Sequence, residues 1–571
     1  MKQEAVKILQ KALKELKINL KPEEIDSVIE VPKDHENGDY AFPCFFLARQ
    51  LKSAPHEIAL DIRTKIKSSH GGFQEVQTAG PYINFFVDRK VLALEITSEI
   101  IKQKDSFGKS KKNKKNILVE FPGPNTNKPL HLGHLRNMAI GESVSRILEF
   151  AGFKIIRGNI VNDRGIHICK SMAAYQKYGK DKTPKDAGKK SDHFVGDYYV
   201  MFNNKSKENK DLEILSHHLL QKYEQGDKET VELLKKMNKW ALDGFKQTYE
   251  KFGIKHDCED YESKIYTKGR DIILQGVEKG VFKKKKKDGA IYINLKNKKL
   301  GEKVLLRADG TSLYMTQDIY LAKERLEKYN LNEIIYVVGD EQIYHFNVLF
   351  EILELLGIAS KESLNHLSYG HVELPEGKMK SREGTIVDGD DLIEKIQDLV
   401  KKQLEKREKL SKKQLEERSL KITLAAIKYL LLKTDIKKNI MFNPKESVSF
   451  EGDTGPYIQY SYARASSIIK KSKIKAFQIK EFKKLEPKEI ELVKKLAEFP
   501  QMTQKACNDL NPTVIANYAY ELAQIFNEFY HSCPVIGSKE KEVFRLKLVK
   551  AFRQVLKNAL YLLGIDVLEE M

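Results

Sequence analysis

The chain has 571 residues, too many for one hydrophobic core, and a prior of about 150 residues per domain predicts three or four folded units. Lysine and arginine together number 100 against 80 for aspartate and glutamate, which gives a formal net charge of +20. An excess of this size favours a polyanionic partner such as nucleic acid. The alternative is a lysine-rich surface that serves solubility alone.

The five cysteines are scattered and form no CxxC pair and no Cys/His cluster at the spacing of zinc ligands. This argues against structural zinc and against a disulfide framework. No apolar run approaches the roughly 20 residues that a membrane-spanning helix needs. The first residues, MKQEAVKILQKALKEL, are typical of an amphipathic helix and not of a signal sequence. We therefore expect a soluble protein of a reducing compartment.

Residues 1 to about 110 predict a small mixed α+β domain. A first helix is followed by the turn-rich HENGDYAF, by an amphipathic helix from Phe45 to Ser53, and by the strand-like YINFFV from Tyr82. The basic, polar stretch from Lys109 to Lys115 is interpreted as a linker to the next domain.

A nucleotide site is predicted where the next domain begins. Ile117 to Phe121 is typical of a buried parallel strand, and the Pro- and Gly-rich residues 122–125 end it. After Pro129 apolar residues recur at helical spacing until Gly152, which offers a left-handed helix stop. A strand that runs into a helix N-terminus forms an anion site, because unpaired backbone N–H groups and the helix dipole point at the ligand. We expect a polyphosphate there.

The tetrapeptide His131-Leu132-Gly133-His134 lies at the start of this predicted helix. Gly133 lets a ligand approach the backbone, and the two imidazoles can donate hydrogen bonds to phosphate oxygens. Donors aimed at a developing pentacoordinate phosphate would speed nucleotidyl transfer without a covalent nucleophile. The alternative for an isolated HxGH is that both histidines pair with backbone in a packed corner.

Farther along, KIIRGNIVND from Lys154 predicts a neighbouring strand that ends near Asp163. The range from about 175 to 264 is long, charged and helical, and is interpreted as an insertion between two halves of the nucleotide fold. Lys283 to Lys287 lies between two short strand-like runs and predicts a hairpin tip. That tip is either simply solvated or in contact with phosphate.

The second half of the fold begins where Asp309 and Gly310 turn into a helix that places Tyr314 and Asp318 on one face. A buried aspartate suits the planar fork of a guanidinium. Ile334 to Val338 predicts a strand, followed by the polar residues Gly339, Asp340, Glu341 and Gln342 and then by His345. Ligands of open α/β sheets bind beyond such strand ends. We expect Gly339 and Asp340 near a ribose and His345 in the wall of the site.

The rest of the chain predicts helices, with a charged stretch after Asp391 and an all-helical region from about Met441. The segment GPYIQYSYAR offers Tyr457, Tyr460 and Arg464 for stacking on unpaired bases. The alternative is that these tyrosines pack in a helix interface.

Several blocks resemble those of class I aminoacyl-tRNA synthetases, and specifically of the arginyl-tRNA synthetase family. PNTNKPLHLGH from Pro124 resembles the HIGH signature of that class. The other blocks follow in family order and span nearly the whole chain: RGNIVNDRGIH from Arg157, DGTSLYMTQDI from Asp309, VVGDEQIYH from Val337, LPEGKMKSREGT from Leu374 and GDTGPYIQYSYAR from Gly452.

The resemblance implies an α/β fold with a Rossmann-type class I catalytic domain at residues 116–400, including the helical insertion at about 175–264. It also implies a small α+β N-terminal domain at 1–110 that contacts the tRNA elbow, a helical connector at 401–440 and an all-α anticodon-binding bundle at 441–571. The implied reaction uses ATP with Mg²⁺ to activate L-arginine and transfers it to the terminal ribose of tRNA(Arg). A cytoplasmic monomer that needs bound tRNA before activation is expected.

The same resemblance assigns roles to residues. His131, His134, Lys128 and Lys378 are expected to be catalytic. ATP binding is expected of His131, Gly133, His134, Gly339, Asp340, His345, Lys378, Met379 and Lys380. Arginine binding is expected of Glu120, Asn125, Tyr314, Asp318 and Gln342, and tRNA binding of Tyr457, Tyr460 and Arg464. The second lysine of the KMSKS signature is missing in register, and the resemblance implies that Lys128 compensates for it.

Three alternatives differ in class. Another class I synthetase, for cysteine or glutamate, is disfavoured by the lack of zinc-spaced cysteines and by the Tyr314/Asp318 pair. A non-catalytic tRNA-binding paralogue is disfavoured by the intact His131 and His134. A nucleotidyltransferase without an RNA partner would leave the positive charge and the terminal helices unexplained.

Overall fold

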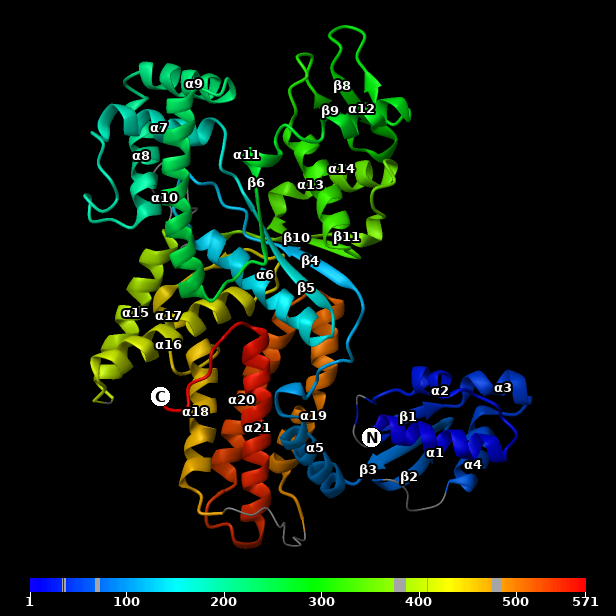
Figure 1. Ribbon diagram of the computed structural model, residues 1–571. Helices are drawn as coiled ribbons and strands as arrows, with labels where there is room; N and C mark the ends of the chain where they lie inside the picture. Colours follow the sequence, from blue (N-terminus) through cyan, green and yellow to red (C-terminus); the bar gives the residue numbers. More distant parts are fainter. Residues whose placement is uncertain (33, 35–36, 67–71, 374–386, 408, 475–483) are drawn as a thin grey trace. The chain divides into compact units, whose positions relative to one another are not determined.

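The computed structural model describes the whole chain apart from residues 33, 35–36, 67–71, 374–386, 408 and 475–483. The chain forms two compact units, which are seen with their elements labelled in Figure 1. The first unit comprises residues 1–107, 468–498 and 524–555. The second comprises residues 108–467, 499–523 and 556–571.

The N-terminal part of the first unit is α+β, as the sequence predicts. Its antiparallel sheet has the order β1-β3-β2. The strands are β1 (Tyr40–Pro43), β2 (Phe73–Ala79) and β3 (Tyr82–Val87), and the helices are α1 (Lys2–Glu15), α2 (Pro22–Val28), α3 (Phe45–Leu51), α4 (Pro55–Lys65) and α5 (Arg89–Gln103). β3 coincides with the predicted strand YINFFV. The helix predicted from Phe45 to Ser53 ends two residues earlier, because Lys52 takes a left-handed conformation with φ of 52°.

A five-stranded parallel sheet forms the centre of the second unit, in the order β11-β10-β4-β5-β6. Its strands are β4 (Asn116–Glu120), β5 (Lys154–Val161), β6 (Cys258–Tyr261), β10 (Glu333–Gly339) and β11 (Leu364–Tyr369). The three strands predicted from apolar runs, β4, β5 and β10, are all present. β6 lies within the range interpreted as a helical insertion, because the short polar run CEDY lacks the apolar signal of a buried strand.

Helix α6 (Leu132–Phe150) follows β4 and is the predicted helix after the HxGH tetrapeptide. Nearly all of its residues after the first turn are buried. It ends where predicted, since Gly152 has φ of 94° and a Cβ there would lie 2.2 Å from the carbonyl oxygen of Lys111. The turn at residues 131–134 is therefore anchored to a buried helix and cannot shift without disturbing the core.

Two further groups of elements belong to the second unit. The helices α7 (Ile166–Tyr178), α8 (Ser191–Lys205), α9 (Asp211–Glu224) and α10 (Lys228–Phe252) enclose a core of their own. A three-stranded antiparallel sheet, β7-β8-β9, shares an apolar core with three helices. These elements are β7 (Lys283–Lys284), β8 (Ile291–Leu295), β9 (Gly301–Leu306), α12 (Arg270–Glu278), α13 (Tyr314–Lys328) and α14 (Ile343–Leu355). The lysine-rich stretch is the predicted hairpin, since β7 and β8 pair antiparallel.

The remaining chain is mainly helical, as expected. Its helices are α15 (Gly389–Glu405), α16 (Lys412–Leu432), α17 (Pro444–Ser447), α18 (Gly455–Lys471), α19 (Pro487–Asn508), α20 (Thr513–Ser532) and α21 (Glu542–Leu562). Within the described residues, none of the helices combines the length and the apolar character required to cross a bilayer.

Candidate active site

A cavity of about 920 Å³ opens at the carboxyl ends of β4, β5 and β10, beside the start of α6. Most of the predicted site residues line it: Glu120, Asn125, Lys128, His131, Gly133, His134, Tyr314, Asp318, Gly339, Gln342 and His345. Among the described residues, Asp340 does not line this cavity, although Gly339 and Glu341 on either side of it do. Lys378, Met379 and Lys380 fall in 374–386, outside the described residues.

The first turn of α6 is capped by two imidazole rings. Nδ1 of His131 accepts the backbone N–H of Gly133 at 3.1 Å, and Nδ1 of His134 accepts the backbone N–H of His131 at 3.1 Å. The ring centroids are 3.9 Å apart. The sequence alternatives of backbone pairing and ligand binding are thus compatible, because each ring uses Nδ1 for the backbone and keeps Nε2 for the cavity.

Both rings are held neutral. Burial, together with the nearby Lys128 ammonium, lowers the pKa of His131 to about 3. Burial also places the pKa of His134 well below its ordinary value, with additional repulsion from His131 and Lys128. A neutral ring that accepts at Nδ1 must hold its proton on Nε2. The cavity therefore receives two fixed N–H donors and, from Lys128, one ammonium whose own pKa is lowered by burial.

Glu120 is paired with an arginine that the sequence reasoning did not find. The buried guanidinium of Arg325 binds the Glu120 carboxylate, and its Nε donates to Asp260 at 2.8 Å. Burial opposes the charge on Arg325, but the two carboxylates raise its pKa above the ordinary value. Arg325 lies on α13, 205 residues from Glu120, so no local sequence signal connects the two. Glu120 still lines the cavity, but part of its charge is already balanced.

A second carboxylate that the sequence reasoning missed faces the predicted arginine pocket. Glu262 lines the same cavity as Tyr314 and Asp318, and burial raises its pKa to about 7. Arg164 lies 3.9 Å from Glu262 and 3.1 Å from Glu224. Glu262 belongs to the range interpreted as a helical insertion, where a single acidic residue carries no signal.

The two residues predicted as a pair both line this pocket: Tyr314 lies at its entrance and Asp318 lies inside it. Tyr314 is 69 % exposed, whereas the Asp318 carboxylate is bound by Nε2 of His345 at 2.7 Å. His345, expected beside ATP, thus contacts a residue expected to bind arginine. Its predicted role in ATP binding stays a prediction.

Arg136 joins α6 to two segments that are distant in the chain. Its fully buried guanidinium donates to the carbonyls of Gly370 and His371 and to those of Ile436 and Lys438, the last at 2.8 Å. Four carbonyl acceptors stabilise a buried guanidinium without a carboxylate. This arginine fixes residues 370–371, which line the cavity, to the helix that carries the histidines.

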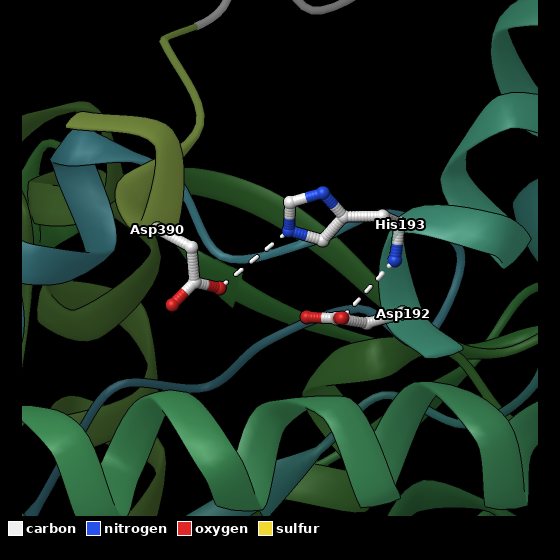
Figure 2. Close-up of side chains that lie close together, drawn as sticks. All are labelled: Asp192, His193 and Asp390. Carbon is white, nitrogen blue, oxygen red and sulfur yellow. Dashed lines mark hydrogen bonds and ion pairs between the residues drawn. The ribbon is translucent and has the colours of Figure 1, made fainter. Parts of the chain in front are cut away.

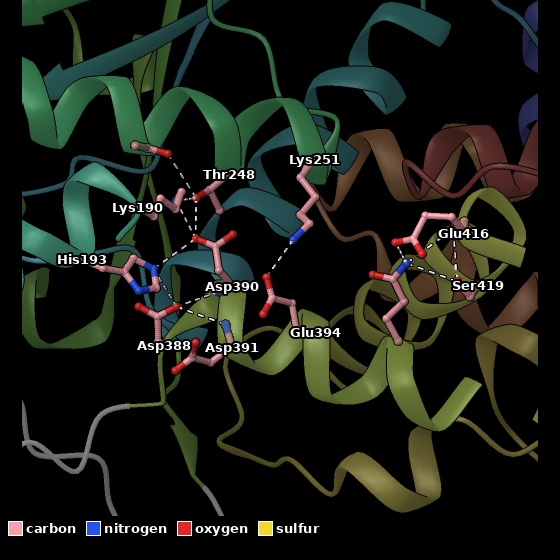
Figure 3. A network of polar contacts seen from close by, with 12 residues as sticks. Lys190, His193, Thr248, Lys251, Asp388, Asp390, Asp391, Glu394, Glu416 and Ser419 are labelled. Carbon is pink, nitrogen blue, oxygen red and sulfur yellow. Dashed lines mark hydrogen bonds and ion pairs between the residues drawn. The ribbon is translucent and has the colours of Figure 1, made fainter. Parts of the chain in front are cut away.

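A network of charged residues connects α8, α10 and the start of α15, as Figure 2 and Figure 3 show. Lys190 contacts Asp390 at 2.6 Å and Asp192 at 3.0 Å, and Nε2 of His193 lies 3.4 Å from Asp388 and 3.5 Å from Asp390. Although the cluster could geometrically hold a metal ion, Lys190 already supplies a cation to its carboxylates.

This network lies directly beside the turn that carries His131 and His134. Asp388 pairs with His131 as an antiparallel bridge, and the backbone N–H of Leu132 donates to the carbonyl of Val387 at 3.1 Å. The Asp388 side chain also caps α15. The charged network therefore holds the backbone that lies against the two histidines.

Tyr457, Tyr460 and Arg464 all lie on α18. The Arg464 guanidinium is 4.9 Å from the ring centre of Tyr460, and the ring centres of Tyr457 and Tyr520 are 5.8 Å apart. Their role in tRNA binding stays a prediction. The neighbouring Tyr462 is buried and donates to Glu569 at 3.0 Å, which agrees with the packing alternative for that residue.

Comparison with known families identifies the class of the protein. Residues 95–443 match the catalytic domain of class I tRNA synthetases, type R, residues 458–571 match the DALR anticodon-binding domain, and residues 3–87 match the arginyl tRNA synthetase N-terminal domain. With the parallel sheet and the HxGH turn at its edge, the fold and the site define a class I aminoacyl-tRNA synthetase.

Comparison with individual relatives identifies the family within this class. The chain is 45 % identical to an arginine–tRNA ligase of Treponema denticola over 96 % of this chain and 95 % of that one, and 42 % identical to an arginine–tRNA ligase of Treponema pallidum over 95 % of each. The solved arginyl-tRNA synthetase of Thermus thermophilus matches with a TM-score of 0.80 at 26 % identity over 100 % of both chains. The chain belongs to the arginyl-tRNA synthetase family. It is an ATP-dependent ligase that joins arginine to tRNA.

The His193 network makes stability depend on pH. The Asp390 carboxylate, 3.5 Å from Nε2, raises the pKa of His193, and the Asp388 charge adds to the shift, so the folded state holds this proton more tightly than the unfolded state. The stabilisation is complete below the ordinary histidine pKa of about 6.5 and is lost as pH rises through the raised value. We expect His193→Gln to lower the apparent melting temperature more at pH 6.0 than at pH 9. Equal differences at the two pH values, measured by thermal unfolding of both proteins, would contradict this.

Proposed function

We propose that the cavity activates L-arginine with ATP and then transfers it to the 3′-terminal ribose of tRNA(Arg). The observation that carries this assignment is the pair of neutral imidazoles at the start of α6, whose free Nε2–H groups are donors for phosphate oxygens. A helix N-terminus adds its own positive potential to them.

In the first step, an arginine carboxylate oxygen attacks the α-phosphorus of ATP in line with the leaving group. A bond forms between that oxygen and phosphorus, the bond from phosphorus to the bridging oxygen breaks, and pyrophosphate leaves with the electron pair. No proton has to be removed, because the attacking carboxylate is already ionised. The donors of His131 and His134 and the ammonium of Lys128 stabilise the charge that grows on the phosphate oxygens. From the sequence, Lys378 is proposed to add to this stabilisation, and Lys378, Met379 and Lys380 are proposed to bind ATP.

Selection of arginine is proposed to depend on carboxylates at the other end of the cavity. Asp318 and Glu262 offer two acceptors to a guanidinium, whose planar fork an ammonium cannot reproduce. Tyr314 and Gln342 are proposed to line the side chain. Glu120 and Asn125 are proposed for the α-amino group, with Glu120 held in position by Arg325.

Magnesium is proposed to enter with ATP. Three of the carboxylates that line the cavity, Glu120, Asp318 and Glu262, already face Arg325, His345 and Arg164, respectively, which fits an ion held mainly by phosphate oxygens and water. Such an ion neutralises the leaving pyrophosphate. Gly339 and the neighbouring Asp340 are proposed to bind the ribose of ATP.

The second step and the cellular context are also proposals. Tyr457, Tyr460 and Arg464 are proposed to contact the anticodon arm, and residues 1–110 the tRNA elbow. We propose a monomer that works in the cytoplasm, where the five unpaired cysteines suit a reducing environment. Bound tRNA is proposed to be required before activation.

The proposed reaction is tested by ATP–pyrophosphate exchange with each of the twenty amino acids, with and without tRNA. We expect exchange with arginine alone and only when tRNA is present. Exchange with another amino acid would contradict the assignment of the pocket to arginine. Tight tRNA binding without any exchange would point to a protein that has lost the chemistry.

Glu262 predicts the pH dependence of arginine binding. Burial raises its pKa to about 7, and only the ionised carboxylate attracts a guanidinium. Between pH 6 and pH 8 the ionised fraction rises about tenfold, so the KM for arginine should fall by up to that factor. Glu262→Gln should raise this KM and remove its pH dependence. Glu224→Gln is the matched control, because Glu224 contacts the same Arg164 without lining the cavity. A Glu262→Gln enzyme with the unchanged pH profile would contradict the assignment.

Lys128 is expected to act on rate and not on arginine affinity. Lys128→Met removes the ammonium and keeps most of the side-chain volume, so we expect kcat of exchange to fall about 10²-fold to 10³-fold while the KM for arginine changes less than about threefold. Lys128→Arg, which keeps the charge, should retain more of the rate. Unchanged kcat in the methionine variant would show that Lys128 does not compensate for the missing signature lysine.

A further inference from the structure

Residues 283–307, named here the lysine-rich sheet, comprise β7, β8, β9 and the turns between them. They contain ten lysine or arginine residues and two acidic residues, so their net charge is 10 − 2 = +8, against +20 for all 571 residues. The phosphate transfer chemistry of the cavity makes no use of this charge.

The sheet directs its lysines outward. One face contributes Ile291, Ile293 and Leu305 to an apolar core shared with α12, α13 and α14. The polar positions are thereby left to solvent. Four lysines at the hairpin, named here the tip lysines, are exposed: Lys283, Lys284, Lys286 and Lys287.

The tip lysines differ in their pairing from two other lysines of this sheet. Lys296 pairs with Glu302 at 3.1 Å, and Lys298 with Glu351 at 3.6 Å. Among the residues that the structure describes, no carboxylate lies within 4.0 Å of a tip-lysine ammonium. Adjacent like charges repel, and an external polyanion that releases its counterions relieves the repulsion. A surface that served solubility alone would mix both signs of charge, as the Lys/Glu-rich α16 does.

The sheet and the cavity are built on the same helices. α13 begins with Tyr314 and carries Asp318, and α14 carries His345, all three of which line the cavity. Beside them, Tyr344 donates its hydroxyl to the carbonyl of Leu300 at 2.8 Å and so ties α14 to the turn before β9. Figure 1 shows the sheet as an extension of this helical layer. Tyr314 is 69 % exposed, so the cavity opens beside this layer, and a polymer that enters past Tyr314 has its adjoining residues next to the layer.

We propose that the tip lysines bind backbone phosphates of the acceptor arm of tRNA while its 3′-terminal ribose occupies the cavity. This inference rests on the proposed function, which requires that ribose in the cavity. The contact is electrostatic and independent of base identity, because four flexible ammonium groups recognise charge and not base edges.

The test replaces all four tip lysines by glutamine. We expect the KM for tRNA in aminoacylation to rise at least tenfold, with kcat at saturating tRNA and the KM values for arginine and ATP within about twofold of the parent. The slope of log Kd for tRNA against log salt should fall by about three, since each lost phosphate contact contributes about 0.7 to 0.9. The matched control removes the same charge from exposed lysines of α15, α16 and the loop between them: Lys395, Lys402, Lys406 and Lys412. It should leave both quantities unchanged.

Hydroxyl-radical footprinting of bound tRNA locates the contact. When the parent or the control is bound, the acceptor strand of the tRNA should be protected from cleavage. When the tip variant is bound, only this protection should be lost. The proposal would be overturned if the parent and the tip variant had equal KM and salt slope. It would also be overturned if the tip variant lost protection at the elbow or anticodon arm, or if the control lost protection of the acceptor strand. Footprints need no amino acid, so they separate failure of this contact from failure of the arginine reaction. Unchanged tRNA binding together with lost binding to phosphatidylserine vesicles would assign the surface to a membrane instead.

Discussion

The active site depends on how two imidazole rings satisfy the backbone at the start of α6. Four N–H groups at any helix start lack intrahelical partners, and here Nδ1 atoms of His131 and His134 accept hydrogen bonds from two backbone N–H groups in this turn. That use of Nδ1 leaves only one tautomer for a neutral ring. The same interaction therefore stabilises the turn and turns two Nε2–H groups toward the cavity. A folding constraint and a catalytic requirement are met by one hydrogen bond in each ring.

The charged groups around this turn are balanced by partners that lie far away in the chain. Arg136 donates to the carbonyls of residues 370, 371, 436 and 438, and Arg325 binds both Glu120 and Asp260. Removing one member of such a set leaves a buried charge without compensation, which is far more costly than the net value of the pair. These partners hold the side chains in place at the wall of the cavity. In its outer part, Tyr314 is exposed.

The sequence predicts those parts of the site whose signals are local. An apolar run, a Pro/Gly turn and helical periodicity predict β4 and α6, and Tyr314 and Asp318 share a face because they are four residues apart. Arg325 and Glu262 could not be predicted, since their roles come from neighbours in space and each is an ordinary charged residue in its own segment. β6 escapes prediction because an edge strand of four residues, two of them acidic, has no periodicity to detect.

Whether both histidines are neutral and donate from Nε2 can be measured by ¹⁵N NMR of histidine-labelled protein. The signals of the two rings are assigned by their loss in His131→Asn and His134→Asn variants. We predict that both rings carry the proton on Nε2 and do not titrate between pH 5 and pH 8, in line with a pKa of about 3 for His131. A ring protonated on Nδ1, or a titration near the ordinary histidine pKa of about 6.5, would contradict the account.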